Sequence, residues 1–304
     1  MLVHFGSSNL DFEWSGSVLT IGTFDGMHLG HQTLLEKTTQ IAKKTELPSI
    51  LVTFDRHPFA TLFPHQTPFY ISSLDEKLDI ANQLNINICV ILPFDKHLAL
   101  MSAESFFQEV LLSKLKAHHI VIGHDFSFGK DQSGNASWLE KRIPTTIISP
   151  ITTESIRISS QKIRNHIVKG EFTQAKNDLG RSFIMKGIVV RGEGMGRKLG
   201  FPTLNIARSF HQVLPKDGVY AGLCKTSQGL YQAAISIGCR PTFGKNERVI
   251  EAHLLDYAGP FLYGELIELK FESFIRKQEH FSSVEELIEK IKEDVRAIAH
   301  LKIS

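Results

Sequence analysis

The first half of the chain alternates short apolar runs with longer segments of helical periodicity, and this alternation most constrains the fold. The apolar runs predict strands at 17–22, 49–54, 86–92, 119–123 and 145–149. The segments between them predict helices at 28–44, 74–84, 103–115 and 138–141. Strands separated by such helices indicate βαβ units and a mostly parallel sheet. Ligands of such sheets bind beyond the carboxyl ends of the strands, so we expect a site in the loops that follow them.

From about Phe183 the pattern changes to short β-like runs punctuated by glycine and proline. Runs at 187–190, 218–224, 233–238, 249–255 and 266–274 follow one another without helices, which indicates a compact antiparallel barrel. An amphipathic helix follows, with apolar residues on one face at 284, 287, 288, 291, 295 and 298. A length of 304 residues suits two domains. We predict domains at residues 1–180 and 181–304.

Composition excludes several classes of protein. The 34 basic residues nearly balance the 32 acidic ones, so we expect no nucleic-acid partner, because such proteins need a strong basic field. No apolar run approaches the roughly 18 residues that a membrane span requires, and no signal peptide is evident. Three cysteines without a C-x-x-C pair argue against a zinc site and suit a reducing compartment. We therefore expect a cytoplasmic protein.

The string from Gly22 to His31 (G-T-F-D-G-M-H-L-G-H) follows a predicted strand and opens a predicted helix. Its glycines allow backbone to approach a ligand closely. His28 and His31 are three residues apart, so they share a helix face at an N-terminus whose free N–H groups favour an anion. The pattern predicts a phosphate site. The alternative is a tight turn with two surface histidines; a zinc site lacks a third ligand.

Two further segments of the first half carry candidate ligand contacts. Asp125, Phe126 and Phe128 follow a predicted strand, where rings can cover a flat heterocycle and the carboxylate can bind its polar edge. The alternative is that both rings belong to the core. Ser159 and Ser160 resemble a helix N-cap, and Lys162 and Arg164 follow as candidate phosphate cations. For this segment, capping alone is the alternative.

The second half holds a glycine-rich string, 192–205 (G-E-G-M-G-R-K-L-G-F-P-T-L-N), and an acid within a predicted strand. The string lacks the G-K-S/T of a Walker loop, and Pro202 prevents a Rossmann-type helix after it. A plain barrel loop is therefore one interpretation. Alternation along the strand places Glu251 on one face with His253 and Leu255. An exposed strand carboxylate is the alternative to a functional one.

Taken in order, these motifs resemble the bacterial bifunctional riboflavin kinase/FAD synthetases along essentially the whole chain. G-x-F-D-G-x-H-x-G-H, T-F-D-R-H-P at 53–58, the D-F-x-F-G loop and I-S-S-x-x-I-R resemble the FAD synthetase module. G-x-G-R-x-L-G-F-P-T-x-N, V-I-E-A-H-L-L-D at 249–256, and segments 238–242 and 274–281 resemble the riboflavin kinase module. The resemblance implies a Rossmann-like nucleotidylyltransferase domain with a parallel sheet. It also implies a six-stranded antiparallel β-barrel kinase domain with a terminal helix.

The resemblance implies two reactions, with ATP, riboflavin and FMN as substrates and Mg²⁺ as cofactor. The kinase would phosphorylate riboflavin to FMN, and the synthetase would adenylylate FMN to FAD with release of pyrophosphate. It implies catalytic roles for Glu251, His28, His31 and Arg164. It implies ATP binding by Gly22, Phe24, Gly26, His28, His31, Ser159, Ser160, Lys162, Arg164, Gly194, Gly196, Arg197, Thr203 and Asn205. It implies flavin binding by Asp125, Phe126, Phe128 and Arg276, and Mg²⁺ binding by Thr203 and Asn205.

The phosphate motif departs from the family's usual pattern. Gln161 stands where threonine is usual, Lys162 where arginine is common, and Thr23 replaces a frequent asparagine. A glutamine can still hydrogen-bond a phosphate, but its reach differs. Two alternatives therefore stay open: a riboflavin kinase with an impaired adenylylation module, and a flavin- or nucleotide-binding regulator without turnover. We expect a monomer or a weak homo-oligomer.

Overall fold

The computed structural model describes residues 1–6, 15–63, 69–153, 155–208, 211–239 and 248–301. Residue contacts divide the chain into two compact units, Met1–Ser160 and Gln161–Ser304. Helices α7 (Ser160–Lys169) and α8 (Phe172–Leu179) follow this division, and α8 packs on strands of the second unit. The predicted boundary between functional domains, at 180/181, stays a prediction. The division at 160/161 reflects residue contacts and does not test where one activity ends and the other begins. In the described part of the chain, no helix is long and apolar enough to cross a membrane.

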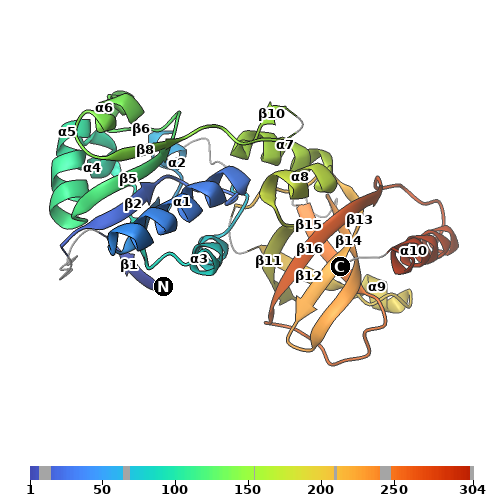
Figure 1. Ribbon diagram of the computed structural model, residues 1–304. Helices are drawn as coiled ribbons and strands as arrows, with labels where there is room; N and C mark the ends of the chain where they lie inside the picture. The colour runs from blue at the N-terminus through green and yellow to red at the C-terminus, as the bar shows by residue number, and fades with distance from the viewer. Residues whose placement is uncertain (7–14, 64–68, 154, 209–210, 240–247, 302–304) are drawn as a thin grey trace. The chain divides into compact units, whose positions relative to one another are not determined.

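The first unit contains a six-stranded parallel sheet, which confirms the predicted fold class (Figure 1). Its strand order is β1 (Leu2–Phe5), β4 (Ile88–Leu92), β3 (Ser49–Phe54), β2 (Ser17–Ile21), β5 (Ala117–Gly123) and β8 (Thr145–Ile148). The β1 strand was not predicted. Short strands pair beside this sheet: β6 (Ser127–Phe128) with β7 (Gly134–Asn135), and β9 (Thr152–Thr153) with β10 (Ile156–Arg157).

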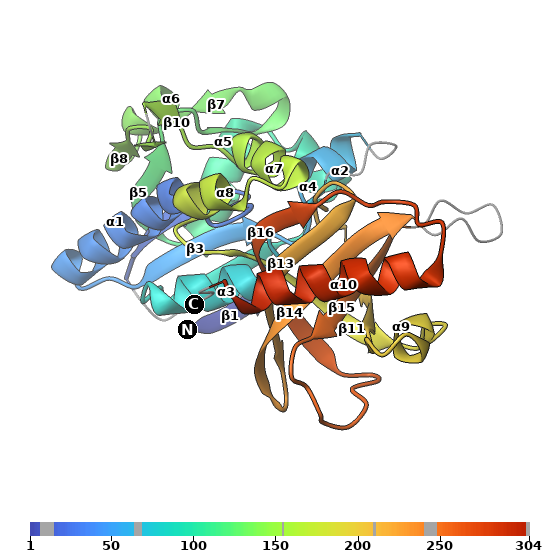
Figure 2. The same cartoon turned by 90° about the vertical axis from the view of Figure 1, so that its right-hand side faces the viewer.

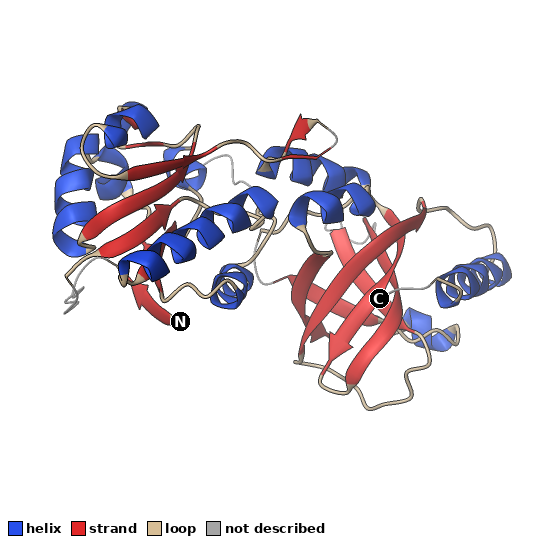
Figure 3. Cartoon of the chain, viewed as in Figure 1, coloured by secondary structure: helices blue, strands red, loops and turns tan. Residues whose placement is uncertain are grey.

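Helices cover both faces of the sheet because alternate residues of each buried strand point to opposite sides. On one face, α1 (Leu29–Thr45) and α3 (Leu74–Gln83) pack Leu35, Ile80 and Ala81 against Leu51, Cys89 and Ile91. On the other face lie α5 (Ala103–Ser105), η1 (Phe106–Lys114) and α6 (Ala136–Glu140). Short helices α2 (Pro58–Leu62), α4 (Lys96–Leu100) and η2 (Lys130–Gln132) lie in the loops. Figure 3 shows the helices in blue around the red strands.

Segment 103–115, predicted to be helical, is largely a π-helix. After α5, η1 forms hydrogen bonds between residues five apart, and its last turn ends with the Leu115 N–H donating to the Val110 carbonyl at 2.9 Å. Its buried residues form two pairs, each four residues apart: Phe106 with Val110, and Phe107 with Leu111. That spacing places all four side chains on the core face of a wider helix. Apolar periodicity alone does not separate this from an α-helix.

The order of the strands reverses beside β2. The chain passes from β2 to β3 and β4 on one side, and then returns to β5 on the other side of β2. The carboxyl ends of β2 and β5 therefore form the switch point where open sheets of this kind bind ligands. The loops that leave these two ends, 22–28 and 124–126, contain two of the predicted motifs.

The second unit is a closed six-stranded antiparallel barrel, as predicted, in the order β11-β12-β15-β14-β13-β16. Its elements are β11 (Phe183–Val190), α9 (Met195–Lys198), β12 (Leu204–Arg208), β13 (Gly218–Thr226), β14 (Gly229–Cys239), β15 (Arg248–Leu254), β16 (Leu266–Arg276) and α10 (Val284–Ala299). The β12 strand was not predicted. Figure 2 shows α10 lying across the barrel strands, where Val295 and Ile298 pack beside Ala221 and Leu255.

Candidate active sites

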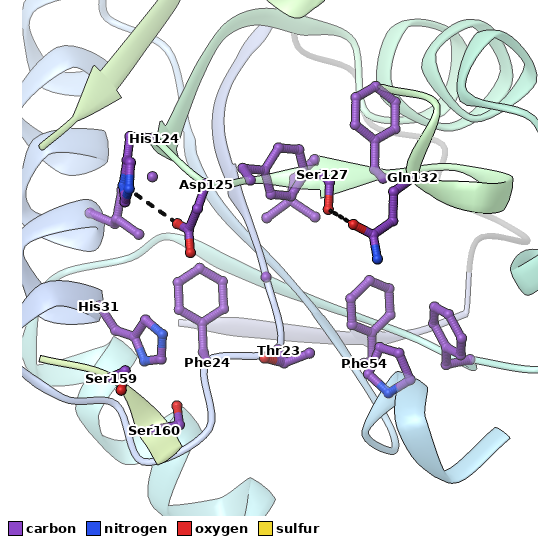
Figure 4. Close-up of a pocket in the computed structure, with 18 of the residues that line it drawn as sticks. Thr23, Phe24, His31, Phe54, His124, Asp125, Ser127, Gln132, Ser159 and Ser160 are labelled. Atoms are coloured by element: carbon purple, nitrogen blue, oxygen red, sulfur yellow. Dashed lines mark hydrogen bonds and ion pairs between the residues drawn. The ribbon is translucent and has the colours of Figure 1, made fainter. Parts of the chain in front are cut away.

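A pocket of about 890 Å³ opens at the switch point of the first unit. The loops after β2, β3, β4 and β5 line it, together with residues 148–151 and 157–160. Figure 4 shows His31, Phe24, Ser159 and Ser160 at one end, and Phe54 toward the other. The pocket therefore has a polar end and an end lined by rings. The predicted residues among its lining are Gly22, Phe24, His28, His31, Asp125, Phe126, Phe128, Ser159 and Ser160.

His28 and His31 meet at the start of α1, as their spacing predicted. The His31 backbone N–H donates to His28 Nδ1 at 3.3 Å, so His28 caps the helix with its own ring. The two imidazoles stack with centroids 3.6 Å apart, and Phe24 meets the His31 ring edge-on at 5.2 Å. Burial, with help from the nearby charges of His28 and Lys77, holds the pKa of His31 well below its ordinary value. His31 is therefore a neutral imidazole near pH 7.

The loop between β2 and α1 is braced by a buried carboxylate, Asp25, for which the sequence predicted no role. Asp25 is 1% exposed, and its Oδ1 accepts the N–H groups of Ile71 at 3.0 Å and Ser72 at 3.4 Å. The Ser160 hydroxyl donates to the Asp25 carbonyl at 2.9 Å. These bonds fix the loop that carries the histidines. A buried aspartate inside a glycine loop is the signal that could have identified it.

Gly26, predicted to bind ATP, is buried in the same brace and is not among the pocket-lining residues. Its φ of 83° lies in the left-handed region, and its N–H donates to the Ser72 hydroxyl at 3.0 Å. A side chain there would meet Ile71 at 3.0 Å. This position needs glycine for backbone conformation and packing. Its predicted ATP contact stays a prediction.

Phe126 and Phe128 line the pocket and also pack against the core, and their predicted flavin contact stays a prediction. Their rings lie nearly parallel with centroids 5.6 Å apart, and both line the pocket. Both also pack against the core formed by η1 and the sheet, and Trp138 meets Phe128 edge-on at 5.5 Å. The apolar end also contains Phe54, which belongs to the T-F-D-R-H-P segment at 53–58. Five further lining residues belong to none of the matched motifs: Phe63, Phe94, Leu98, Met101 and Phe106.

Asp125 carries an ion pair at the pocket wall. Arg157 Nη2 donates to its Oδ2, and His124 Nδ1 lies 3.6 Å from its Oδ1 (Figure 4). Partial burial opposes ionisation, but the Arg157 guanidinium outweighs it and lowers the pKa of Asp125. Arg157 lines the pocket and was not predicted, although it immediately precedes the I-S-S motif. The wall therefore presents a carboxylate and a guanidinium already paired.

Lys162 and Arg164, the predicted phosphate cations of α7, have protein partners. Lys162 Nζ lies 3.1 Å from the carboxylate of Asp178, which is 1% exposed. Arg164 Nη1 donates to Gln161 Oε1 at 3.4 Å, and Gln161 Nε2 donates to Asn165 Oδ1 at 3.0 Å. Gln161, the departure from the family pattern, thus joins a hydrogen-bonded chain along the helix. The phosphate contacts of both cations stay predictions.

The barrel brings Asn205 and Glu251 together across two strands. They are register partners on β12 and β15, and Glu251 is also paired with Ser236 on β14. Partners in an antiparallel pair project to the same face, with Cβ atoms about 5 Å apart. Both side chains are half-buried, and they alternate with the buried Ile206, Ile250 and Ala252. They therefore project from the outer face of the barrel wall.

The glycine-rich string folds closely around this pair. A Cβ at Gly192 would lie 2.2 Å from the Asn205 carboxamide nitrogen. A Cβ at Gly196 would lie 2.4 Å from the Phe201 carbonyl and 3.2 Å from the Thr203 hydroxyl. Glycine is therefore required for the loop to approach Thr203 and Asn205. Gly194, with a φ of 69°, precedes α9 and has open space around it.

Arg197 and Arg276 occupy different settings. Arg197 is exposed, and its guanidinium lies 4.4 Å from the centre of the Phe261 ring, a cation–π contact. Arg276 is largely buried and donates from Nε and Nη2 to Asp294 at 2.8–3.0 Å. The flavin contact predicted for Arg276 stays a prediction. Residues 240–242 of the matched 238–242 segment lie outside the described residues.

Comparisons with known proteins find a family match for each half of the chain. A family model described as FAD synthetase matches residues 11–163, and one described as riboflavin kinase matches residues 179–302. A protein of Listeria monocytogenes named bifunctional riboflavin kinase/FMN adenylyltransferase is 34% identical over 296 residues, 94% of each chain. One of Bacillus subtilis with the same name is 31% identical, over 93% of this chain and 91% of that one.

Among solved structures, a Streptococcus pneumoniae protein titled macrolide-efflux protein superposes with a TM-score of 0.91. It is 28% identical, and the match covers 99% of this chain and 100% of that one.

Proposed function

The chain belongs to the family of bifunctional riboflavin kinase/FMN adenylyltransferases and is a transferase that makes FMN and FAD, and we propose which residues carry each step. We assign FMN adenylylation to residues 1–180 and riboflavin phosphorylation to residues 181–304. The assignment rests on the observation that each of the two matched regions contains a cluster of candidate site residues. These sites are the two-ended pocket in the first match and the Asn205–Glu251 pair in the second.

For the kinase, we propose that Glu251 accepts the proton of the riboflavin 5′-hydroxyl as the γ-phosphoryl group of ATP is transferred. Half-burial on a rigid strand supports this role, because the carboxylate is held in place without being sealed from substrate. Gly194, Gly196 and Arg197 are proposed to contact the ATP phosphates. Thr203 and Asn205 lie under the same loop.

The oxygens around Glu251 fit Mg²⁺. The ion prefers hard oxygen ligands and keeps several waters and substrate phosphate oxygens. Thr203 supplies a hydroxyl and Asn205 a carboxamide oxygen, and no cluster of three His, Cys, Asp or Glu side chains occurs among the described residues. Such a sparse donor set suits an ion delivered with ATP. When bound, Mg²⁺ would neutralise charge on the transferred phosphates.

For adenylylation, we propose that a phosphate oxygen of FMN attacks the α-phosphorus of ATP and that pyrophosphate leaves. The protein supplies alignment and charge, with no covalent intermediate. His28, His31, Ser159 and Ser160 would hold the phosphates at the polar end of the pocket, beside Gly22 and Phe24. The flavin ring would lie at the apolar end on Phe126 and Phe128, with Asp125 at its polar edge. Lys162 and Arg164 complete the proposed cations.

Three parallel incubations test both activities. The full chain is mixed with riboflavin, ATP and MgCl₂, and the products are separated by chromatography; a parallel reaction starts from FMN, and a third contains EDTA. We expect FMN and FAD from riboflavin, FAD from FMN, and neither product with EDTA. FMN without FAD would overturn the adenylylation assignment and favour an impaired module, consistent with Gln161. Bound flavin without any product would reject both.

We also propose that the enzyme works in the cytoplasm as a monomer or weak homo-oligomer. Cys89, Cys224 and Cys239 are free thiols, which suits a reducing compartment. Light scattering coupled to gel filtration tests the second point. A stable assembly at micromolar concentration would contradict it.

A further inference from the structure

Arg276, at the end of β16, is the centre of a clamp rather than a free cation. Its Nε and Nη2 donate to both carboxylate oxygens of Asp294 on α10, at 2.8–3.0 Å. Its Nη1 donates to the carbonyl of Lys277 at 3.1 Å and lies 3.8 Å from Glu279. The two side chains of the ion pair are only 15% and 7% exposed. A bidentate pair this well buried fixes geometry as well as charge.

The clamp fixes the segment that follows it, Lys277–Phe281. The first carbonyl of the segment is held by the guanidinium, and the Phe281 ring lies 5.8 Å from it at the far end. Both ends of the segment are therefore tied to one side chain, which is itself tied to α10. The position of the residues between them depends on the Arg276–Asp294 pair.

Gln278, within this segment, lies on the wall of the barrel at Gly238. An ideal Cβ on Gly238 would lie 1.9 Å from Gln278 Nε2 and 2.2 Å from Oε1. The carboxamide therefore occupies the space that any other residue at 238 would fill with its side chain. Gly238 is buried for this reason, although it is near the end of β14.

Strand alternation places Gln278 on the same face as Glu251. Ile235 and Ile237 of β14 are buried in the barrel, so Ser236 and Gly238 face outward. Ser236 is the register partner of Glu251. From strand spacings of about 4.8 Å and a rise of about 3.4 Å per residue, Gly238 lies roughly 8 Å from Glu251. That separation suits riboflavin, whose ribityl chain separates the 5′-hydroxyl from the ring.

We propose that Gln278 binds the polar edge of the riboflavin ring in the kinase site, and that Arg276 and Asp294 are its positioning residues. A carboxamide offers both a donor and an acceptor, which matches the alternating N–H and C=O groups of that edge. In this arrangement Arg276 acts through Gln278, as an alternative to the direct flavin contact that the sequence predicts for it. The inference rests on the proposed role of Glu251.

Steady-state kinetics of the full chain test the inference, with riboflavin varied at saturating MgATP and then the reverse. We expect Gly238→Ala, which displaces the Gln278 carboxamide at little cost to folding, to raise the riboflavin KM about tenfold with kcat within about twofold. Asp294→Asn should do the same, and the KM for ATP should not change. Glu293→Gln, the same chemical change at an exposed neighbour on α10, is the control and should match the wild type.

A riboflavin KM within about twofold of wild type in Gly238→Ala would overturn the inference. A fall in kcat together with an equal rise in the KM values for riboflavin and for ATP would overturn it too. Gly238→Ala decides the matter if Asp294→Asn does not fold. FAD formation from supplied FMN should be unchanged in every variant. Failure of the proposed function is distinguishable, because the wild-type chain would then form no FMN.

Discussion

His28 and His31 stack face to face at the N-terminus of α1, with ring centroids 3.6 Å apart and planes inclined by 17°. His28 caps the helix through Nδ1, while Nδ1 of His31 is buried without a hydrogen-bond partner in the described residues. Two stacked imidazoles cannot both carry a proton cheaply at this distance. Protonation of His31 should therefore destabilise the stacked pair and the start of α1 that it forms.

The first prediction concerns the pH dependence of stability. The pKa of His31 is lowered in the folded chain, so below about pH 6.5 the unfolded state binds more protons than the folded state. The first unit should lose stability as the pH falls from 7.5 to 5.5, and His31→Gln should lose less. Urea unfolding followed by tryptophan fluorescence measures this, since Trp14 and Trp138 both precede residue 160. Parallel pH profiles for the two proteins would contradict it.

The second prediction concerns the brace beneath the histidines. Asp25→Ala removes the acceptor of the Ile71 and Ser72 N–H groups and leaves them buried. We expect the free energy of unfolding of the first unit to fall by about 1–3 kcal/mol. Asp79→Ala, at an exposed position in α3, is the control and should cost nothing measurable. Equal stability of the two variants would show that the brace contributes nothing.

The sheet and the histidine pair were predictable because local physics determines them. Strand 49–54 was placed to the residue, since its apolar run is bounded by polar and turn residues. His28 and His31 were paired from helix spacing alone. In contrast, β12 has the polar residues Asn205 and Arg208 within five positions, so it gives no apolar run. It is a strand because its neighbours β11 and β15 supply hydrogen-bond partners.

The site residues that sequence missed depend on contacts between distant segments. Arg157 and Asp125 are 32 residues apart, and Arg276 and Asp294 are 18 apart. No local pattern states which carboxylate an arginine will meet. Arg276 was therefore predicted to face a ligand, and only the packing of α10 reveals its partner. Such ion pairs depend on the tertiary fold, because only the fold brings the two charged side chains together.

The third prediction separates the two activities. Glu251→Gln keeps the size of the side chain but cannot accept a proton, so FMN formation should fall by at least about 100-fold. FAD formation from supplied FMN should be unchanged. Chromatography of both reactions measures this, with Glu285→Gln at an exposed position of α10 as the control. Unchanged FMN formation would reject Glu251 as the base.

The last prediction concerns the glycine that faces Asn205. A methyl group at Gly192 would lie 2.2 Å from the Asn205 carboxamide nitrogen, so Gly192→Ala should displace that side chain without unfolding the barrel. If Asn205 helps to hold Mg²⁺ and ATP, the kcat/KM for MgATP should fall about tenfold or more, equivalent to about 1.4 kcal/mol of transition-state stabilisation.

Gly200→Ala is the matched control, because nothing lies within 4 Å of its Cβ position and no ligand contact is proposed for it. Its φ of 87° costs an alanine some backbone strain, which should lower stability slightly but leave the Asn205 side chain in place. A larger loss in kcat/KM for Gly200→Ala than for Gly192→Ala would show that loop conformation, and not the position of Asn205, limits the reaction. Titrating Mg²⁺ in both variants sharpens the result, since only displacement of Asn205 should raise the concentration of Mg²⁺ needed for half-maximal rate.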